Sequence, residues 1–244
     1  MNFYFFDSLN NLLDIFYPQA CVVCGKYEKN HSEWICQKCA RRIIKYKKEK
    51  YDEAIVPIIY EKSNSGMQVK KYFDGLLFIY EYKSIIRKII LNYKFRDSSY
   101  ISHFFVSEIL NSKKFNEILT RYDIIISVPI DKMRERVRGY NQTAIILKEL
   151  NKIINSEKAG IKISTDNLIK IKKTQRQSLL TGIEREKNVK DAFNLVRPKE
   201  IIGKNIIVFD DIYTTGSTIN EISKLLKSNG ARKVLAFTLA KDWF

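Results

Sequence analysis

The chain has 244 residues, and 45% of them are hydrophobic, which is enough for one α/β domain with a packed core and a small additional module. This composition excludes wholesale disorder, and no apolar run approaches the about 18 residues of a membrane-spanning helix. The formal charge of +16 favours an anionic partner, such as nucleic acid, a phosphorylated substrate or an anionic membrane. Because Lys, Ile and Asn are abundant throughout, a biased genome is the alternative source of part of that charge.

Residues 1–17 carry an apolar stripe at helical spacing. Its members are Phe5, Phe6, Leu9, Leu12, Leu13 and Phe16. We expect a short amphipathic helix that ends before Pro18 and docks onto the rest of the fold, with membrane or partner binding as the alternative. The N-terminus has no basic flank and carries Asp7 and Asp14 within the apolar pattern. These features argue against a secretory signal peptide and predict a cytoplasmic protein.

The four cysteines of the chain form two C-x-x-C pairs with eleven residues between them. They are Cys21, Cys24, Cys36 and Cys39. Two such pairs at this separation favour a tetrahedral thiolate site for structural zinc. A redox pair is the alternative, whereas two disulfides are not expected in a chain without export signals. Since so short a segment buries little core, the metal would supply its folding free energy, and His31 would be a solvated loop residue.

A strongly basic run follows the cysteines. It contains Arg41, Arg42, Lys45, Lys47, Lys48 and Lys50. A solvated helix face is the first interpretation of such a run. The second is a surface for single-stranded nucleic acid, in which the cations follow the phosphates and the nearby Trp34, Tyr46 and Tyr51 stack on bases.

The next predicted elements are a strand over Leu76 to Tyr80 and a helix marked by four isoleucines from Ile85 to Ile90. The polar break after that helix contains Lys94 and Arg96, which would either meet an oligophosphate or remain ordinary surface cations. Another helix is expected from about Tyr100. Its apolar pattern includes His103, for which we expect a packing role.

A second buried strand is predicted over Ile124 to Val128. The polar segment after it carries arginines at every second position, which we interpret as a mobile loop that reaches a charged substrate. Candidate residues of this flexible loop are Arg134, Arg136, Arg138, Asn141 and Gln142. A helix follows, with Asn141 as its N-cap. Further strands are expected over Ala192 to Val196 and Val234 to Leu239.

The richest stretch begins with Ile206 to Phe209, four apolar residues that indicate a strand buried on both faces of a parallel sheet. Asp210 and Asp211 follow where that strand ends. Small, hydroxyl-rich residues come next: Thr214, Thr215, Gly216, Ser217 and Thr218. A helix with Leu225 and Leu226 on its apolar face then continues toward Gly230. Thr218 and Glu221 fit a capping box at its start.

A turn between the end of a strand and the N-terminus of a helix offers free backbone N–H groups to a phosphate. The two carboxylates would repel a bare phosphate, so they favour a ligand that carries hydroxyls or a divalent metal beside its phosphate, as a phosphorylated sugar does. The alternative is an ordinary strand–turn–helix crossover with a solvated Asp pair. The stretch is not a Walker loop, since no Gly-Lys-Ser/Thr follows.

The run V-F-D-D-I-Y-T-T-G-S-T resembles the phosphoribosyl pyrophosphate motif of type I phosphoribosyltransferases. In that family, two acids hold the ribose hydroxyls and a Thr-rich loop wraps the 5′-phosphate. The resemblance therefore implies that Asp210 and Asp211 are catalytic and ligand-binding residues. It also implies that residues 214–218, with Lys94 and Arg96, bind phosphoribosyl pyrophosphate together with magnesium.

Four motifs in order resemble the ComF family of competence proteins: the cysteine module, V-P-x₄-R-x-R-x-R-G-Y-N-Q, a polar segment that ends in N-V-x-x-A-F, and the phosphoribosyl loop. The resemblance implies a type I phosphoribosyltransferase-like α/β domain, a parallel sheet flanked by helices, over residues 53–244. A small N-terminal helix and zinc module would occupy residues 1–52. The characteristic polar positions carried over are Arg138, Gly139, Asn141, Gln142, Thr174, Gln177, Arg185 and Asn188.

This resemblance also implies a role in bringing single-stranded transforming DNA into the cytoplasm. The partners would be single-stranded DNA, the membrane-bound uptake machinery and an ATP-driven translocase, with the protein in the cytoplasm or peripheral at the inner face of the membrane. Two alternatives stay open. One is a metabolic transferase that moves phosphoribosyl onto a nucleobase, with basic residues such as Lys94, Arg134 and Arg136 offsetting the charge of the pyrophosphate. The other is a ligand-sensing regulator without catalysis.

Overall fold

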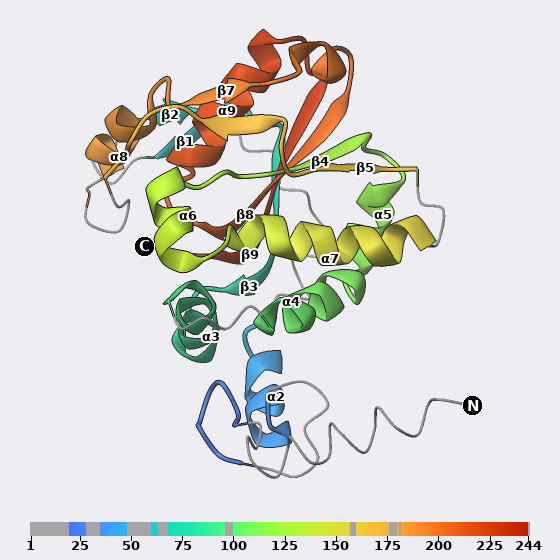
Figure 1. Ribbon diagram of the computed structural model, residues 1–244, viewed down its shortest axis with the longest axis vertical. Coiled ribbons are helices and arrows are strands. Elements are labelled where there is room, and N and C mark those ends of the chain that lie inside the picture. The colour runs from blue at the N-terminus through green and yellow to red at the C-terminus, as the bar shows by residue number, and fades with distance from the viewer. Residues whose placement is uncertain are drawn as a thin grey trace.

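The computed structural model describes residues 20–27, 35–47, 60–62, 68–95, 100–156, 160–175, 180 and 182–243. Its centre is a five-stranded sheet in the order β3-β9-β8-β4-β5, in which every neighbouring pair is parallel (Figure 1). The strands are β3 (Gly75–Glu81), β4 (Ile124–Ser127), β5 (Lys162–Ser164), β8 (Asn205–Tyr213) and β9 (Lys233–Lys241). The strands predicted from the buried apolar runs at 76–80, 124–128, 206–209 and 234–239 are therefore confirmed.

The two faces of the sheet belong to two hydrophobic clusters, because successive side chains of a strand point to opposite faces. In β8, Ile207 and Phe209 enter one cluster, and Ile206 and Val208 enter the other. All four side chains are fully buried. This two-sided burial explains why the run has no polar break, and it fixes β8 in the middle of the sheet.

Four helices cover the face that Phe209 enters, and α6 follows the end of β4. They are α3 (Ser84–Phe95), α4 (Ile101–Leu110), α5 (Lys113–Leu119) and α7 (Gln142–Ser156), and α6 spans Lys132–Arg138. The other face is covered by α9 (Ser217–Ser228) and by an antiparallel ribbon of β6 (Leu168–Lys170) and β7 (Phe193–Leu195). The remaining elements are β1 (Tyr60–Lys62), β2 (Gln68–Lys70), α8 (Gly182–Val189) and a 3₁₀ helix, η3 (Pro198–Ile201).

The cysteine segment, residues 20–27 and 35–47, forms a small module, the ribbon, against α3 and α4 (Figure 1). Its helix, α2 (Gln37–Ile44), directs Cys39 and Ile43 inward. These buried side chains lie in the same hydrophobic cluster as the α3 residues Ile86 and Ile90. The ribbon is joined to β3 by a hydrogen bond of 3.1 Å from the Glu81 N–H to the Tyr46 carbonyl. The ribbon therefore shares the hydrophobic core of the sheet domain and does not pack as a separate unit.

Two sequence predictions are corrected by these elements. The segment after β4 is the helix α6, where a mobile loop was expected, and His103 is exposed on α4, where packing was expected. The predicted N-terminal helix lies outside the described residues, and so do Trp34, Tyr51 and His31. Among the described helices, none combines the length and the hydropathy that crossing a membrane requires.

Candidate functional site

The carboxylate site is defined here as Asp210 and Asp211, at the C-terminal end of β8, together with the turn 214–218. Both carboxylates are half-buried. The Asp211 N–H donates to Asp210 Oδ1 at 2.8 Å, and Lys94 Nζ of α3 forms an ion pair with Asp211 Oδ2 at 2.7 Å. The acids lie in the last part of β8, which continues to Tyr213 and does not end at Phe209 as predicted. The structure also brings Lys94 to them.

The hydroxyl-rich turn leads directly into α9, which begins at Ser217 with Gly216 as its N-cap. The Oγ1 atom of Thr215 lies 2.7 Å from Ser217 Oγ, and Lys71 Nζ donates to the Thr215 carbonyl at 2.8 Å. The first N–H groups of a helix have no partner within the helix, so this turn offers backbone donors and two hydroxyls to an anion.

Gly216 is required by the shape of this turn. Its φ of +70° is a conformation that L side chains rarely adopt. A Cβ atom at this position would also lie 2.5 Å from the hydroxyl oxygen of Tyr213, whose side chain is fully buried. The predicted capping box is wrong: the N-cap is Gly216, and Glu221 Oε1 accepts a hydrogen bond from the Asp191 N–H at 2.9 Å instead.

The electrostatics of the site centre on Asp210. Burial, and then repulsion from Asp211, raises the pKa of Asp210 to about 7, although Lys94 and Lys170 lower it in part. Lys170 of β6 is affected in turn, because burial and the nearby Arg134 lower its pKa to about 8. Asp211 is paired with Lys94, whereas Asp210 has a raised pKa because it is buried beside a second carboxylate. The two carboxylates are suited to a ligand with hydroxyl donors or a bound cation.

The helix α6 divides the three predicted arginines between two faces. Arg134 and Arg138 are four residues apart, share a face and are half-buried, whereas Arg136 is exposed. Arg134 Nη2 donates to the Thr174 carbonyl at 2.7 Å. The helix begins because Asp131 caps the Met133 N–H at 2.9 Å, and it ends at Gly139. The arginines stand at every second position, but they do not all point the same way, because the segment is a helix and not an extended chain.

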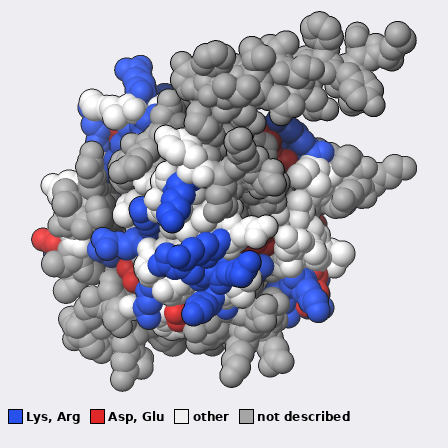
Figure 2. All heavy atoms as spheres, turned by 90° about the horizontal axis from the view of Figure 1, so that it is seen from below, with Lys and Arg blue, Asp and Glu red and all other residues white. Residues whose placement is uncertain are grey.

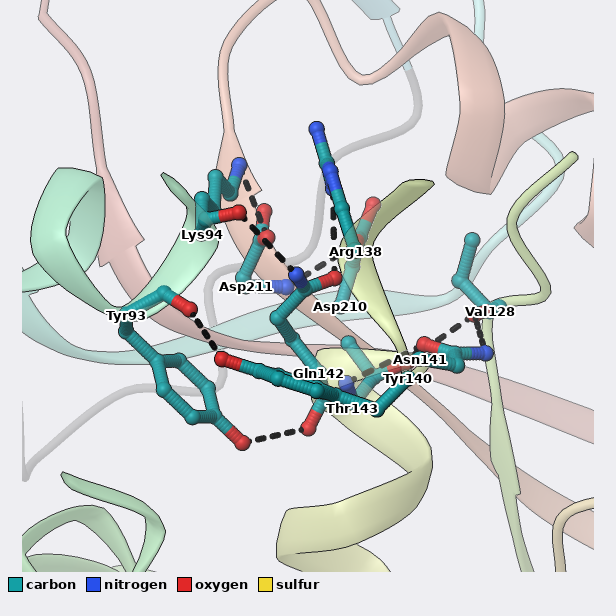
Figure 3. A network of polar contacts seen from close by, with 10 residues as sticks. All are labelled: Tyr93, Lys94, Val128, Arg138, Tyr140, Asn141, Gln142, Thr143, Asp210 and Asp211. Atoms are coloured by element: carbon teal, nitrogen blue, oxygen red, sulfur yellow. Dashed lines mark hydrogen bonds and ion pairs between the residues drawn. The ribbon is translucent and has the colours of Figure 1, made fainter. Parts of the chain in front are cut away.

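Gln142 connects α6 and α3 beside the carboxylates, with its amide between Arg138 and Lys94 (Figure 3). Its Oε1 accepts from Arg138 Nη1 at 3.2 Å, and its Nε2 donates to the Lys94 carbonyl at 3.5 Å. Its own carbonyl accepts from the Tyr93 hydroxyl at 2.9 Å. The Tyr140 hydroxyl donates to the Tyr93 carbonyl at 2.8 Å. The R-G-Y-N-Q segment therefore links Arg138 to the C-terminal end of α3 through these hydrogen bonds, and that end carries Lys94, the partner of Asp211.

Asn141 has the predicted capping role. Its Oδ1 accepts from the Thr143 N–H at 3.2 Å, which caps α7, and its Nδ2 donates to the Val128 carbonyl at 3.2 Å (Figure 3). Thr143 Oγ1 donates to the same Val128 carbonyl at 2.9 Å. These bonds tie the start of α7 to the end of β4, the strand beside β8.

The other polar positions have mixed outcomes. Asn188 holds the backbone of Gln175 through two hydrogen bonds, at 2.9 and 3.1 Å, and Arg185 Nε donates to the Leu180 carbonyl at 2.9 Å. Thr174 lies between two cations: its carbonyl accepts from Arg134, and its Oγ1 accepts from Lys170 Nζ at 2.6 Å. Arg96 and Gln177 lie outside the described residues.

Two lysines of this site were missed by the sequence analysis, Lys71 and Lys170. Both come from elements that lie far from β8 in the sequence and reach the site only in the folded chain. Lys71 follows β2, and Lys170 ends β6. In a chain with 43 basic residues, a single lysine carries no local signal. The local pattern even points the wrong way, because a lysine between Ile169 and Ile171 predicts buried isoleucines, whereas both isoleucines are exposed.

The four cysteine sulfurs fit a zinc ion. The Sγ atoms all lie within 4.8 Å of one another, and Cys24 Sγ is 3.8 Å from Cys36 Sγ. A tetrahedral zinc site with Zn–S distances of about 2.3 Å requires sulfur–sulfur separations of about 3.8 Å. Burial opposes ionisation of Cys21, but backbone N–H donors, first that of Cys36, lower its pKa to about 7. Burial raises the pKa of Cys36 and Cys39, so a cation is needed to hold four thiolates together.

Comparison with known proteins supports both regions. Residues 12–51 match a family described as the double zinc ribbon domain. Competence protein F of Haemophilus influenzae is 25% identical over 93% of this chain and 98% of its own length. DNA utilization protein YhgH of Escherichia coli O157:H7 is 31% identical, over 59% of this chain and 60% of its own length. Competence protein ComFC of Bacillus subtilis is 27% identical over 67% of this chain and 63% of its own length.

Two solved structures also resemble this chain. The allosteric regulatory enzyme of purine biosynthesis has a TM-score of 0.34 at 21% identity, covering 56% of this chain and 25% of that one. Glutamine phosphoribosylpyrophosphate amidotransferase from B. subtilis has a TM-score of 0.30 at 21% identity, covering 50% and 24%. This chain thus spans about a quarter of the length of each solved chain.

The structure combines a parallel sheet flanked by helices, an acid pair and a hydroxyl-rich turn on its central strand, and a four-cysteine module that matches the double zinc ribbon family. The predicted fold class is therefore confirmed. Proteins named competence protein F, ComFC and DNA utilization protein YhgH are homologues of this chain. The resemblance to the ComF family of competence proteins is confirmed with them.

Proposed function

We propose that this protein binds phosphoribosyl pyrophosphate with magnesium at the carboxylate site, binds single-stranded DNA, and acts in the uptake of transforming DNA. The observation that carries the proposal is the pairing of Asp210 and Asp211 with the N-terminus of α9, inside a group of basic side chains. The names of the homologues support the competence role. The proposed location is the cytoplasm, near the inner face of the membrane, with the uptake machinery and its translocase as partners.

Each part of this ligand has a partner in the site. The carboxylates of Asp210 and Asp211 accept hydrogen bonds from the ribose hydroxyls, and the first N–H groups of α9 with Thr215 and Ser217 surround the 5′-phosphate. Lys71 fixes the turn through its bond to the Thr215 carbonyl. Residues 214–218 thus keep the roles expected from the sequence.

The pyrophosphate group needs positive charge, and four basic side chains supply it. Lys94 pairs with Asp211, and the charge of Lys170 acts on Asp210. Arg134 and Lys170 both bond to Thr174, and Arg138 bonds to the Gln142 side chain. Magnesium would be held by ligand oxygens and by Asp210 or Asp211, and it would offset charge on the pyrophosphate. Arg96 belongs to the same proposal through its position in the sequence alone.

The proposed organisation is a ribbon over residues 1–52, with zinc in a structural role, followed by the phosphoribosyltransferase-like domain over residues 53–244. The four sulfurs and the family match of residues 12–51 support the first unit. The five-stranded sheet, whose first strand begins at Gly75, supports the second.

The exposed face of the ribbon is the proposed surface for single-stranded DNA. Figure 2 shows Lys and Arg side chains gathered on the face seen from below in Figure 1, where α2 lies. On α2 and just after it, Arg41, Arg42 and Lys45 are exposed, and Tyr27 of the adjacent turn is 66% exposed. Cations spaced along one helix face follow a phosphate backbone, and an exposed aromatic ring stacks on a base.

The test of the sugar-phosphate proposal is titration calorimetry with phosphoribosyl pyrophosphate and magnesium. Replacement of both acids, Asp210→Asn with Asp211→Asn, should abolish binding without unfolding the protein. The control is Asp166→Asn with Asp191→Asn, an equal change of charge on two exposed carboxylates, which should bind as the wild type does. Equal affinity of the two double variants would refute the assigned roles.

The test of the DNA proposal is fluorescence anisotropy with a labelled single strand at increasing salt. Replacing Arg41, Arg42 and Lys45 with Ala should weaken binding and lower the slope of log K against log salt by about 2, since each phosphate contact contributes about 0.7. The charge-matched control replaces the exposed Lys187, Lys190 and Lys224 of the α8 and α9 region. Absence of binding at low salt, or an equal loss in both variants, would remove this part of the proposal.

The gathered cations also favour a second function, transfer of phosphoribosyl onto a nucleobase or similar acceptor. Such a reaction develops positive charge on the sugar and releases pyrophosphate, which Lys94 and Lys170 would stabilise. Pyrophosphate release with a panel of bases tests it. Ligand binding without release with any base would favour the third interpretation, a non-catalytic ligand sensor.

A further inference from the structure

The helix α3 contacts the zinc ribbon and the carboxylate site at the same time. Asn92 Nδ2 donates to the Val22 carbonyl at 2.7 Å, and Lys88 Nζ donates to the Val23 carbonyl. Two residues after Asn92, Lys94 forms its 2.7 Å ion pair with Asp211. One helix thus connects two regions that are far apart in the sequence.

The two carbonyls belong to the metal-binding turn itself. Val22 and Val23 are the residues between Cys21 and Cys24, and the turn closes through a 2.8 Å hydrogen bond from the Gly25 N–H to the Cys21 carbonyl. The direction of these carbonyls is therefore set by the conformation that the cysteines adopt around their metal. Asn92 is only 9% exposed, so its amide has no solvent to replace the Val22 carbonyl if that partner moves.

The last turn of α3, which contains Asn92, is also held on the side of the carboxylate site. The Lys94 carbonyl accepts from Gln142, and Tyr93 both donates to the Gln142 carbonyl and accepts from Tyr140 (Figure 3). Asn92 and Lys94 are separated by about 3 Å along the helix axis, at about 1.5 Å per residue. A shift of α3 that follows the ribbon must therefore move Lys94 relative to Asp211, because a packed helix moves as one body.

We propose that Asn92 is a positioning residue of the carboxylate site, which acts through Lys94, and that the metal-bound turn thereby supports ligand binding at the end of β8. This inference rests on the proposed binding of phosphoribosyl pyrophosphate. It assigns the ribbon a role in that site in addition to any contact with DNA. It also explains why a side chain with hydrogen-bonding groups is retained at a buried helix position that otherwise packs isoleucines.

The experiment is a double-mutant cycle read by titration calorimetry with phosphoribosyl pyrophosphate and magnesium. Asn92→Leu should weaken binding about fivefold, within the range of couplings between neighbouring residues. Lys94→Met weakens binding by itself, and Asn92→Leu should then have no further effect in the Lys94→Met background. A purely structural role for Asn92 would give the same factor in both backgrounds, which would overturn the inference.

The matched control is Asn116→Leu, which removes another asparagine bond to a backbone carbonyl, Asn116 Nδ2 to Leu110 at 3.0 Å, on α5 away from the site. It should leave ligand affinity unchanged. If Asn92→Leu fails to fold, Lys88→Met is used, since it removes the neighbouring bond from an exposed position. Binding by the wild type with no change in either α3 variant removes this inference alone. Failure of the wild type to bind removes the proposed function with it.

A second readout does not depend on the ligand. Amide hydrogen exchange in the last turn of α3 should be faster in Asn92→Leu than in the wild type, with zinc content unchanged at one ion per chain. Unchanged exchange there would contradict the positioning role even if affinity fell.

Discussion

The zinc ribbon and the carboxylate site are both small clusters of polar atoms at the border of one core, but the chain assembles them in different ways. The ribbon takes its four sulfurs from residues 21–39. The carboxylate site takes its side chains from β8, α3, α6, β6 and the loop after β2. The ribbon is thus encoded by local spacing, whereas the site is encoded by the topology of the sheet.

The two regions also differ in what stabilises them. In the ribbon, burial raises the pKa of Cys36 and Cys39, so the arrangement depends on a cation. At the carboxylate site, the backbone is held by the fully buried run Ile206 to Phe209. Asp211 is paired with Lys94, and burial beside Asp211 raises the pKa of Asp210. Loss of a ligand should therefore unfold the first region and leave the second region folded.

The largest expected effect breaks the ribbon. Cys39→Ser removes one buried thiolate, and we expect the zinc content to fall from one ion per chain to near zero, because structural zinc supplies about 10–16 kcal/mol in zinc-finger peptides. Metal analysis and limited proteolysis within residues 20–47 measure it. The double variant at Asp210 and Asp211 serves as the control and should keep its zinc. Retention of a full zinc equivalent by Cys39→Ser would contradict the four-thiolate site.

The next effect breaks the turn of the carboxylate site. Gly216→Ala places a Cβ 2.5 Å from the Tyr213 hydroxyl oxygen and keeps a φ of +70°, so backbone strain of about 1–2 kcal/mol is joined by overpacking of about 1–3 kcal/mol. We expect a clear loss of unfolding free energy in urea and loss of ligand binding. Gly203→Ala is the matched control, because its φ is +72° with no atom within 4 Å of the added Cβ. Equal losses in both variants would show that strain alone matters.

Local spacing explains which features could be predicted from the sequence. The cysteine pairs, the buried run before Asp210 and the N-cap Asn141 are each defined by neighbours within a few residues, and each was found. Lys94 was named as a candidate in the polar break after a strand–helix unit. The structure instead places it in the last turn of α3, from which it reaches Asp211.

Other features depend on contacts that no local pattern reports. The segment 132–138 forms a helix because Asp131 caps it, although its arginines alternate as in an extended chain. Thr218 and Glu221 have capping-box spacing, but the Glu221 carboxylate accepts a hydrogen bond from the backbone N–H of Asp191 in the neighbouring loop. Lys71 and Lys170 reach the site through β2 and β6, whose placement depends on the assembled fold.

A smaller effect concerns the charge of Asp210. Its pKa is raised from 3.8 to about 7 in the folded protein, so the folded state binds this proton more tightly than the unfolded state does. The sign follows: the contribution of this group to unfolding free energy is full below pH 4, falls as pH rises toward 7, by at most about 1.4 kcal/mol per unit, and is constant above it. Urea unfolding between pH 5 and 8 should show this slope in the wild type and not in Asp210→Asn. Identical pH slopes in the two proteins would contradict the raised pKa.

Ligand affinity should have the opposite dependence on pH. If the ionised form of Asp210 accepts the ribose hydroxyls or magnesium, binding strengthens as pH rises from 6 to 8, by about tenfold for a pKa near 7. Calorimetry in two buffers of different ionisation enthalpy should detect a proton released on binding near pH 7. The Asp166→Asn variant should release the same proton, because its carboxylate is exposed and distant from the site.

The smallest effect sharpens the distinction between local pattern and assembled geometry. Arg134 and Arg136 are two residues apart on α6, but only Arg134 faces the site, where it bonds to the Thr174 carbonyl at 2.7 Å. Arg134→Ala should weaken binding of phosphoribosyl pyrophosphate about fivefold, which corresponds to about 1 kcal/mol. Arg136→Ala should stay within about twofold of the wild type, since its side chain is solvated. Equal losses would mean that α6 unwinds when the ligand binds and that the alternating pattern, not the helix, describes the bound state.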